Sequence, residues 1–171
     1  MSKNIVLVGL SGTGKTTVGN ILKTKLQKFS FIDTDEMVVE EERRSINDIF
    51  AKDGEDFFRN LETKAAKKAS KGQNTIISTG GGIVLRETNI ELLKQNGIIF
   101  YLKTTPEILT KRLQGDNSRP LLKTEDVKLK LENMLKVRSS LYEKADVIID
   151  TDNLTPEQTA KEIVRIYNER S

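Results

Sequence analysis

A segment near the start of the chain, residues 9–16, constrains the fold more than any other part of the sequence. It reads GLSGTGKT and matches the phosphate-binding pattern G-x-x-x-x-G-K-S/T. An apolar run at 5–8 precedes it, and apolar residues recur at helical spacing from 18 to 26. A strand, a glycine-rich loop and a helix in this order direct backbone N–H groups toward a bound polyphosphate. The segment therefore predicts a site for ATP or GTP at the edge of an α/β sheet.

The residue types within this loop predict how the nucleotide is held. Lys15 can reach the β- and γ-phosphates, and the hydroxyl of Thr16 can ligate Mg²⁺. Glycines let the backbone come close to the phosphates. We expect the contacts of the loop to come from Gly12, Thr13, Gly14, Lys15, Thr16 and Thr17.

Strand-like apolar runs alternate with helical segments along the rest of the chain. The runs lie at 5–8, 31–32, 75–78, 98–102 and 147–149. Helix starts are predicted at Ser45, at Thr105 with Pro106 and at Thr155 with Pro156, and a long helix is predicted from about 124 to about 144. Runs that are apolar on both faces favour a parallel sheet covered on both sides, so we predict one α/β domain over 1–171.

Composition narrows the chemistry and the partners. The chain has 171 residues, with 28 Lys and Arg against 25 Asp and Glu, and its net charge of +3 does not indicate nucleic-acid binding. Because it has no cysteine and no histidine, any general base is Asp, Glu, Lys or Tyr. No apolar stretch approaches the ~20 residues of a membrane span and no leader pattern opens the chain. We therefore expect a cytoplasmic protein that binds no membrane, and a monomer.

Two acids follow the second predicted strand, where ligands bind in parallel sheets. Asp33 and Asp35 come directly after the run at 31–32, on the same sheet edge as the phosphate-binding loop. Either acid alone could simply cap a following helix. The pair is typical of a site in which one acid holds Mg²⁺ or its waters and the other orients an acceptor hydroxyl.

Three consecutive glycines, Gly80, Gly81 and Gly82, follow the run at 75–78 on that same edge. They form either a flexible turn or a backbone that must come close to a ligand. Because three glycines cost considerable backbone entropy, the second interpretation is favoured.

Other segments have a plain interpretation when each is taken alone. Phe58, Arg59 and Glu62 predict a core aromatic beside a surface ion pair on a helix, and Arg138 predicts a solvated helical side chain. The polar stretch at 114–120 is either a surface loop or a lid over a ligand.

Taken in order, these segments resemble the shikimate kinase family along essentially the whole chain. The residues that carry the resemblance are 9–16, Asp33-Thr34-Asp35, Phe58-Arg59 with Glu62, Gly80-Gly81-Gly82, Arg119-Pro120-Leu121-Leu122, and Arg138 with Tyr142. The resemblance implies a three-layer P-loop kinase fold, similar to that of nucleoside monophosphate kinases, with a five-stranded parallel sheet flanked by helices. It also implies a short lid at about 114–124 and substrate-binding helices at about 34–62.

The resemblance further implies an activity, the transfer of the ATP γ-phosphate to the 3-hydroxyl of shikimate on the route to aromatic amino acids. Lys15, Asp35 and Arg119 would be catalytic, and Thr16 and Asp33 would hold Mg²⁺. Arg112, Arg119 and Pro156 would complete the ATP site. The shikimate site would consist of Asp35, Phe58, Arg59, Glu62, Gly80, Gly81, Gly82 and Arg138, with the two arginines on the carboxylate.

Four other functions fit a phosphate-binding loop. A gluconate-type sugar-acid kinase also needs to bind a carboxylate, but the FR, GGG and RPLL segments disfavour it. A nucleoside monophosphate kinase has a phosphate as acceptor and usually a longer lid. A regulatory GTPase needs an N-K-x-D segment for guanine, which this sequence lacks. An inactive P-loop protein that only binds a partner is disfavoured because every expected catalytic side chain is present.

Overall fold

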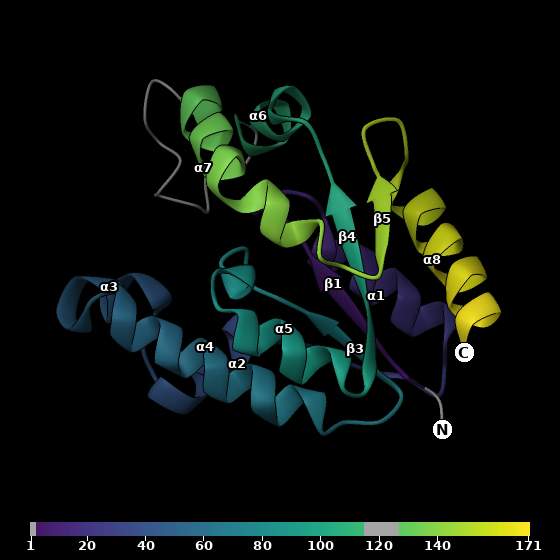
Figure 1. Cartoon of the computed structure of the whole chain (residues 1–171), viewed down its shortest axis with the longest axis horizontal. Helices are drawn as coiled ribbons and strands as arrows, with labels where there is room; N and C mark the ends of the chain where they lie inside the picture. The colour runs from purple at the N-terminus through teal and green to yellow at the C-terminus, as the bar shows by residue number, and fades with distance from the viewer. Residues whose placement is uncertain (1–2, 115–126) are drawn as a thin grey trace.

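Five parallel strands form one sheet, in the order β2-β3-β1-β4-β5 (Figure 1). The structure is a computed structural model that describes residues 3–114 and 127–171. The strands are β1 (Asn4–Val8), β2 (Ser30–Asp33), β3 (Thr75–Ser78), β4 (Gly97–Lys103) and β5 (Val147–Asp150). Each lies within one residue, at either end, of a run predicted from the sequence. The prediction of a parallel α/β sheet is confirmed.

Helices cover both faces of this sheet. Along β1, Ile5 and Leu7 are buried on one face with side chains of α1 (Lys15–Lys25) and α8 (Pro156–Arg170). Val6 and Val8 are buried on the opposite face with side chains of α4 (Glu55–Ser70), α5 (Glu87–Lys94), α6 (Pro106–Gln114) and α7 (Val127–Tyr142). This alternation follows from the two-residue period of a strand, and it produces the three layers expected of the fold.

The connection between β2 and β3 carries two short helices and the long α4. They are α2 (Thr34–Glu42) and α3 (Ile46–Asp53), and they pack with α4 at the lower left of Figure 1. A separate small core of Val38, Ile49, Phe58, Leu61 and Ala65 holds them together. The predicted substrate-binding helices at 34–62 fall on α2, α3 and the first half of α4.

Predicted helix starts agree with the observed caps. The Ser45 hydroxyl accepts a hydrogen bond from the Asp48 backbone N–H at 3.1 Å, and Thr155 forms a capping box with Gln158. Such caps stabilise a helix by about 1 kcal/mol each. Pro106 and Pro156 are the first residues of α6 and α8, where the missing N–H of proline costs nothing.

The stretch 115–126, which includes Arg119 and all but the first residue of the predicted lid, lies outside the described residues. The helix predicted from about 124 to about 144 is described from Val127 and ends at Tyr142. A short 3₁₀ helix, η1 (Ile83–Leu85), follows the three glycines.

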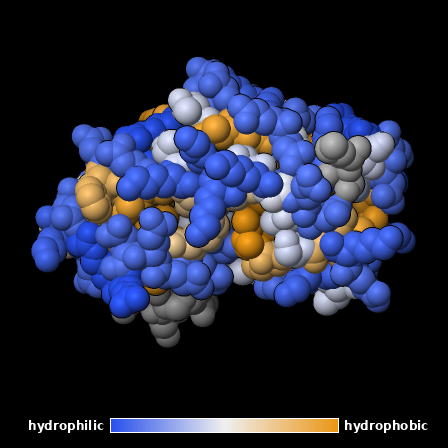
Figure 2. Space-filling view, turned by 90° about the horizontal axis from the view of Figure 1, so that it is seen from below, coloured by the Kyte–Doolittle hydropathy of each residue, from blue (hydrophilic) through white to orange (hydrophobic). Residues whose placement is uncertain are grey.

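The surface of the described chain is mostly hydrophilic. On the face seen in Figure 2, hydrophilic side chains cover most of the area, and apolar atoms show in small, separate patches. None of the helices in 3–114 and 127–171 is long and apolar enough to cross a bilayer.

Candidate active site

Three connections that carry predicted site residues meet at one edge of the sheet. In the strand register, Ser78 at the end of β3 pairs with Leu7 of β1 and with Asp33 of β2. The segments that follow these strands are the phosphate-binding loop, the start of α2 and the three glycines. Parallel strands therefore bring together, at their carboxyl ends, residues that are more than 60 positions apart in sequence.

The phosphate-binding loop has the backbone that the motif requires. Gly12 and Gly14 have φ angles of 87° and 90°, which are unfavourable for residues with a side chain. Gly14 caps α1, so the N–H groups of the first turn of α1 face the loop. The ammonium of Lys15 is buried and donates to the carbonyl oxygens of Gly9 and Leu10, at 2.7 and 2.8 Å. A positive charge is thus held at a helix N-terminus, an arrangement suited to a polyphosphate.

Asp33 caps α2, which is one of the two interpretations that the sequence left open, and it also contacts Thr16. Its Oδ1 atom caps α2 by accepting from the backbone N–H groups of Asp35 and Glu36, at 2.9 and 3.4 Å. Its Oδ2 atom accepts a 3.3 Å hydrogen bond from the Thr16 hydroxyl. The cap holds the carboxylate still, and the second oxygen lies beside the hydroxyl predicted to ligate Mg²⁺.

Asp35 is largely buried next to the glycines. Burial, together with the charges of Asp33 and Glu62, raises the pKa of Asp35 to about 6, and the charges of Lys15 and Arg59 partly oppose this shift. Its Oδ1 atom has no hydrogen-bond partner. A buried oxygen without a partner is costly, so this carboxyl group is well prepared to accept a proton or hydrogen bond from a ligand.

Arg59 and Glu62 form an ion pair that is buried, so the plain prediction of a surface pair was wrong. The guanidinium donates to the Glu62 carboxylate at 2.7 Å, and the two side chains are 11% and 1% exposed. Glu55 accepts a second ion pair from Arg59 at 3.0 Å. The pair is buried because α4 packs this face against the glycines instead of turning it to solvent.

The environment of Glu62 shows that this cluster is well shielded from solvent. Burial raises the pKa of Glu62, while hydrogen bonding to Arg59 and the charges of Arg59, Arg138 and Arg86 oppose the shift. Oε1 of Glu62 has no hydrogen-bond partner. One buried carboxylate thus orients Arg59 and also interacts with the charge of Arg138.

Close packing explains two of the three glycines. A Cβ atom on Gly80 would lie 2.5 Å from Oδ1 of Asp35, and one on Gly82 would lie 2.1 Å from a terminal nitrogen of Arg59. A Cβ on Gly81 would meet nothing nearer than 3.4 Å. The interpretation as a merely flexible turn fails for Gly80 and Gly82, because side chains predicted to bind the substrate occupy the space.

Aromatic rings line the other side of Arg59. The guanidinium carbon lies 5.3 Å from the ring centroid of Phe58 and 5.9 Å from that of Phe50, and the two rings are 4.7 Å apart. This is within the range of cation–π attraction. An arginine confined between rings and a carboxylate has few alternative conformations.

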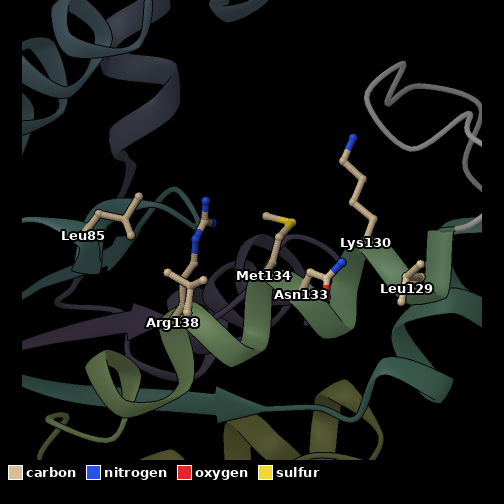
Figure 3. A pocket seen from close by; sticks show the side chains of 7 residues that line it. Leu85, Leu129, Lys130, Asn133, Met134 and Arg138 are labelled. Atoms are coloured by element: carbon tan, nitrogen blue, oxygen red, sulfur yellow. The ribbon is translucent and has the colours of Figure 1, made fainter.

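Arg138 belongs to the same region, although it comes from α7. Its charge acts on the hydroxyl of Tyr142, one turn later on α7, and on Glu62. Figure 3 shows Lys130, Met134 and Arg138 on the same side of α7, with Leu85 of η1 beside Arg138. These four residues line a cavity of about 510 Å³. Arg138 is half-buried and not fully solvated as it would be on an isolated helix.

A larger cavity of about 930 Å³ unites most of the predicted nucleotide site with Asp35. On the nucleotide side, Arg112 also reaches the loop, with NH1 3.5 Å from the carbonyl of Gly12. The predicted residues in the wall of this cavity are Gly12, Thr13, Gly14, Lys15, Thr16, Thr17, Asp33, Asp35, Gly80, Gly81, Arg112 and Pro156.

The remaining predicted residues do not line that cavity in the described part of the chain. Phe58, Arg59, Glu62 and Gly82 form the neighbouring buried cluster, and Arg138 lines the smaller cavity. The two regions are adjacent, because the charges of Arg59 and Glu62 act on Asp35. Arg119 is not among the described residues.

One residue that sequence reasoning left without a role also contributes to this geometry. The hydroxyl of Thr34, which is fully buried, accepts a 3.2 Å hydrogen bond from the backbone N–H of Gly80. It ties the start of α2 to the first glycine. A small hydroxyl residue between two site acids was the available signal.

Comparison with known proteins agrees with this geometry. The family model described as shikimate kinase matches residues 11–168. A shikimate kinase of Thermodesulfovibrio yellowstonii is 42% identical over 99% of this chain and 97% of its own length. One from Caldanaerobacter subterraneus subsp. tengcongensis is 45% identical over 96% of each chain. The structure of Acinetobacter baumannii shikimate kinase in complex with shikimate superimposes with a TM-score of 0.92, at 35% identity, over all of this chain and 96% of that one. A fold, a sheet-edge site and relatives that agree over almost the full length lead to one conclusion: the chain belongs to the shikimate kinase family.

Proposed function

We propose that this protein transfers the γ-phosphate of ATP to the 3-hydroxyl of shikimate, giving shikimate 3-phosphate and ADP. The observation that carries the proposal is that a site for phosphates and a buried ion pair lie next to each other at one sheet edge. A phosphate-binding loop with a buried Lys15 lies on one side of Asp35, and the buried Arg59–Glu62 pair lies on the other. The A. baumannii relative, solved with shikimate, supports this choice of acceptor.

ATP binds along the larger cavity. The loop from Gly12 to Thr17 contacts its phosphates, and Lys15 exchanges its present carbonyl partners for the β- and γ-phosphates. Arg112 and Pro156 also line this cavity, and the resemblance assigns them to the adenine side of the nucleotide. The resemblance assigns Arg119 to the phosphates as a further positive charge.

The residues beside the loop fit Mg²⁺. The ion prefers oxygen ligands and retains several waters, so it is usually held by one or two protein groups together with substrate phosphates. Thr16 and Asp33, whose oxygens lie 3.3 Å apart, would hold it directly or through water. Among the described residues no cluster of three or more acids, histidines or cysteines could hold a metal by itself, and a site shared with ATP does not need one. When bound there, Mg²⁺ would supply positive charge that offsets the negative charge of the ATP phosphates.

The acceptor binds between the arginines and the glycines. Arg59 and Arg138 bind the shikimate carboxylate, because the planar guanidinium matches two carboxylate oxygens. Glu62 orients Arg59 and interacts with the charge of Arg138. Phe58 packs on the ring, and Gly80, Gly81 and Gly82 approach it through their backbone.

Asp35 positions the nucleophile and takes its proton. The 3-hydroxyl oxygen attacks the γ-phosphorus in line, the bond from that phosphorus to the bridging oxygen of ADP breaks, and the hydroxyl proton passes to Asp35. The loose transition state of phosphoryl transfer needs little help from a base. A carboxylate whose pKa is about 6 is therefore adequate in a chain without histidine.

The remaining expectations about partners and organisation stand as proposals. We infer a monomer that acts on two small molecules, binds neither nucleic acid nor membrane, and works as a single kinase domain. The net charge of +3 and the small, separate apolar patches of Figure 2 support this. Analytical ultracentrifugation would test the monomer.

A coupled assay for ADP release tests the reaction. It is run with ATP and Mg²⁺, and with shikimate, with gluconate or without an acceptor. We expect release only with shikimate. Release with gluconate would retain the phosphate site but overturn the acceptor, and with it the roles of Arg59 and Arg138. Absence of release with every acceptor would favour a protein that binds nucleotide without catalysis.

A further inference from the structure

Tyr142, at the end of α7, is a buried tyrosine whose hydroxyl contacts two parts of the acceptor site. Its ring is 0% exposed and stacks on Tyr101 of β4, with ring centroids 4.9 Å apart and an angle of 16° between the planes. The ring therefore has a fixed place against the sheet. The position of its hydroxyl is set by packing that does not involve any ligand.

The hydroxyl of Tyr142 lies between two groups of the acceptor site, the Gly81 carbonyl and the Arg138 guanidinium. It donates to the carbonyl of Gly81 at 2.5 Å, and the guanidinium of Arg138, one turn earlier on α7, lies close enough for its charge to act on the hydroxyl. A tyrosine hydroxyl has a single proton and an arginine can only donate. Because that proton points at Gly81, the hydroxyl presents a lone pair, and not a proton, to Arg138.

Both contacts end on groups that the proposed function places at shikimate. Gly81 lies between Gly80, which packs on Asp35, and Gly82, which packs on Arg59. Arg138 is the second arginine for the carboxylate. A shift of the Gly81 carbonyl would move the glycine backbone that lies between Asp35 and Arg59. It would also move the Tyr142 hydroxyl, so that Arg138 would no longer be held.

We propose that the Tyr142 hydroxyl is a positioning residue for the acceptor, because it holds Arg138 in register with the glycines that line the shikimate site. The inference rests on the proposed function, since it assumes that shikimate is the acceptor. Burial raises the pKa of Tyr142 to about 12, so the hydroxyl keeps the proton that it donates to Gly81 throughout the neutral range.

A second tyrosine offers a matched control. Tyr167 on α8 is also buried, and its hydroxyl also donates to a backbone carbonyl, that of Lys3, at 2.7 Å. Lys3 precedes β1, whereas the phosphate-binding loop follows β1, so this bond lies at the opposite edge of the sheet. Removing either hydroxyl costs one buried hydrogen bond, but only Tyr142 lies at the site.

The test compares Tyr142→Phe with Tyr167→Phe. Both should lower the Tm to a similar extent, because each leaves one carbonyl without its donor. Tyr142→Phe should raise the KM for shikimate roughly tenfold while the KM for ATP and kcat change by less than about threefold, as expected for a lost contact with a charged group. Tyr167→Phe should leave all three kinetic values near those of the wild type. Equal kinetics in the two variants would show that Tyr142 is merely structural.

A double-mutant cycle checks the route through Arg138. In an Arg138→Ala background the added Tyr142→Phe change should alter the KM for shikimate by less than about twofold, because the group that it positions is already gone. If the two substitutions instead raise the KM for shikimate independently, so that their effects multiply in the double variant, the proposal is overturned. Should Tyr142→Phe fail to fold, a crystal structure of the wild-type protein with shikimate serves instead. A Tyr142 hydroxyl more than about 3.5 Å from the Gly81 carbonyl in that complex would overturn it.

The activity of the wild-type protein distinguishes a failure of the inference about Tyr142 from a failure of the proposed function. If the wild-type protein phosphorylates shikimate and the Tyr142→Phe variant has the same kinetics, only the inference about Tyr142 is overturned. If the wild-type protein does not phosphorylate shikimate, the proposed function fails, and the role of Tyr142 fails with it.

Discussion

Arg59 donates a 2.7 Å hydrogen bond to the carboxylate of Glu62 one turn later on α4, and both side chains are almost entirely shielded from water. Burying such a pair costs desolvation energy that the mutual attraction often fails to recover. What the pair provides is a guanidinium already held in one orientation before an anion arrives.

Replacing Glu62 by Gln should change how stability depends on pH. Because burial raises the pKa of Glu62 above its ordinary 4.5, the folded protein retains a proton that the unfolded chain has lost. The unfolding free energy of the wild type relative to Glu62→Gln should therefore fall as the pH rises above the ordinary glutamate pKa of 4.5. Urea unfolding at several pH values measures this. Glu87→Gln is the control: Lys144 lowers the pKa of Glu87, so the trend should be small and opposite.

Adding a methyl group to the glycines should separate their roles. Gly80→Ala places a Cβ 2.5 Å from Asp35, so kcat should fall, and Gly82→Ala places one 2.1 Å from Arg59, so the KM for shikimate should rise. Gly81→Ala should have the smallest effect of the three, because its Cβ meets nothing nearer than 3.4 Å. Steady-state kinetics of the three variants tests this order. A Gly81→Ala variant more damaged than the other two would contradict the packing argument.

Replacing Arg138 by Ala should mainly weaken the binding of shikimate. Loss of one partner of a buried charge pair costs ~2–5 kcal/mol, so the dissociation constant measured by calorimetry should rise accordingly while ATP affinity stays nearly constant. Arg165→Ala is a suitable control, since Arg165 pairs with Glu162 and Glu169 on the exposed side of α8. Unchanged shikimate affinity in Arg138→Ala would remove Arg138 from the carboxylate site.

Replacing Asp35 by Asn should lower kcat with little effect on ATP binding. An amide keeps the shape of the side chain but cannot accept the hydroxyl proton, and general-base roles are usually worth roughly 10²–10⁴-fold in rate. The KM for ATP and kcat are measured in the same assay. A kcat close to that of the wild type would show that Asp35 only orients the hydroxyl, or that it does not contact it.

Replacing Lys15 by Ala should nearly abolish turnover. Removing one group that stabilises charge in the transition state costs roughly 10²–10³-fold in kcat, and Lys15 also bonds the carbonyls of Gly9 and Leu10, so the Tm should fall too. Lys23→Ala, at an exposed position on the same helix, should leave both quantities unchanged. Equal losses in the two variants would show a general effect of charge on α1.

Local signals predicted the elements of the fold, but not their arrangement. The runs around Ile5 and Thr75 predicted strands, and the caps at Ser45 and Thr155 predicted helix starts, because each depends on a few neighbouring residues. The strand order could not be read from any run, since it depends on how long connections cross the sheet. The shared sheet edge was predictable nevertheless, because carboxyl ends of parallel strands meet in any order.

In the candidate site, too, local patterns predicted some features, and other features depend on tertiary packing. Motif spacing placed Thr16 and Asp33 correctly beside each other, since each follows the carboxyl end of a strand. The burial of Arg59 with Glu62 was missed when the segment was considered alone, because their spacing on a helix is the same whether that face meets water or Gly82. The Tyr142 contact with Gly81 joins residues 61 positions apart, and no local pattern indicates it.

The small core of α2, α3 and α4 has a consequence for how this scaffold can diversify. Val38, Ile49, Phe58, Leu61 and Ala65 form a cluster distinct from the two that stabilise the sheet. Insertions, deletions and substitutions in that section should therefore be tolerated without loss of the nucleotide-binding half. Recognition of a new alcohol can evolve there by exchange of one contiguous stretch of chain, while the machinery that cleaves ATP is inherited unaltered.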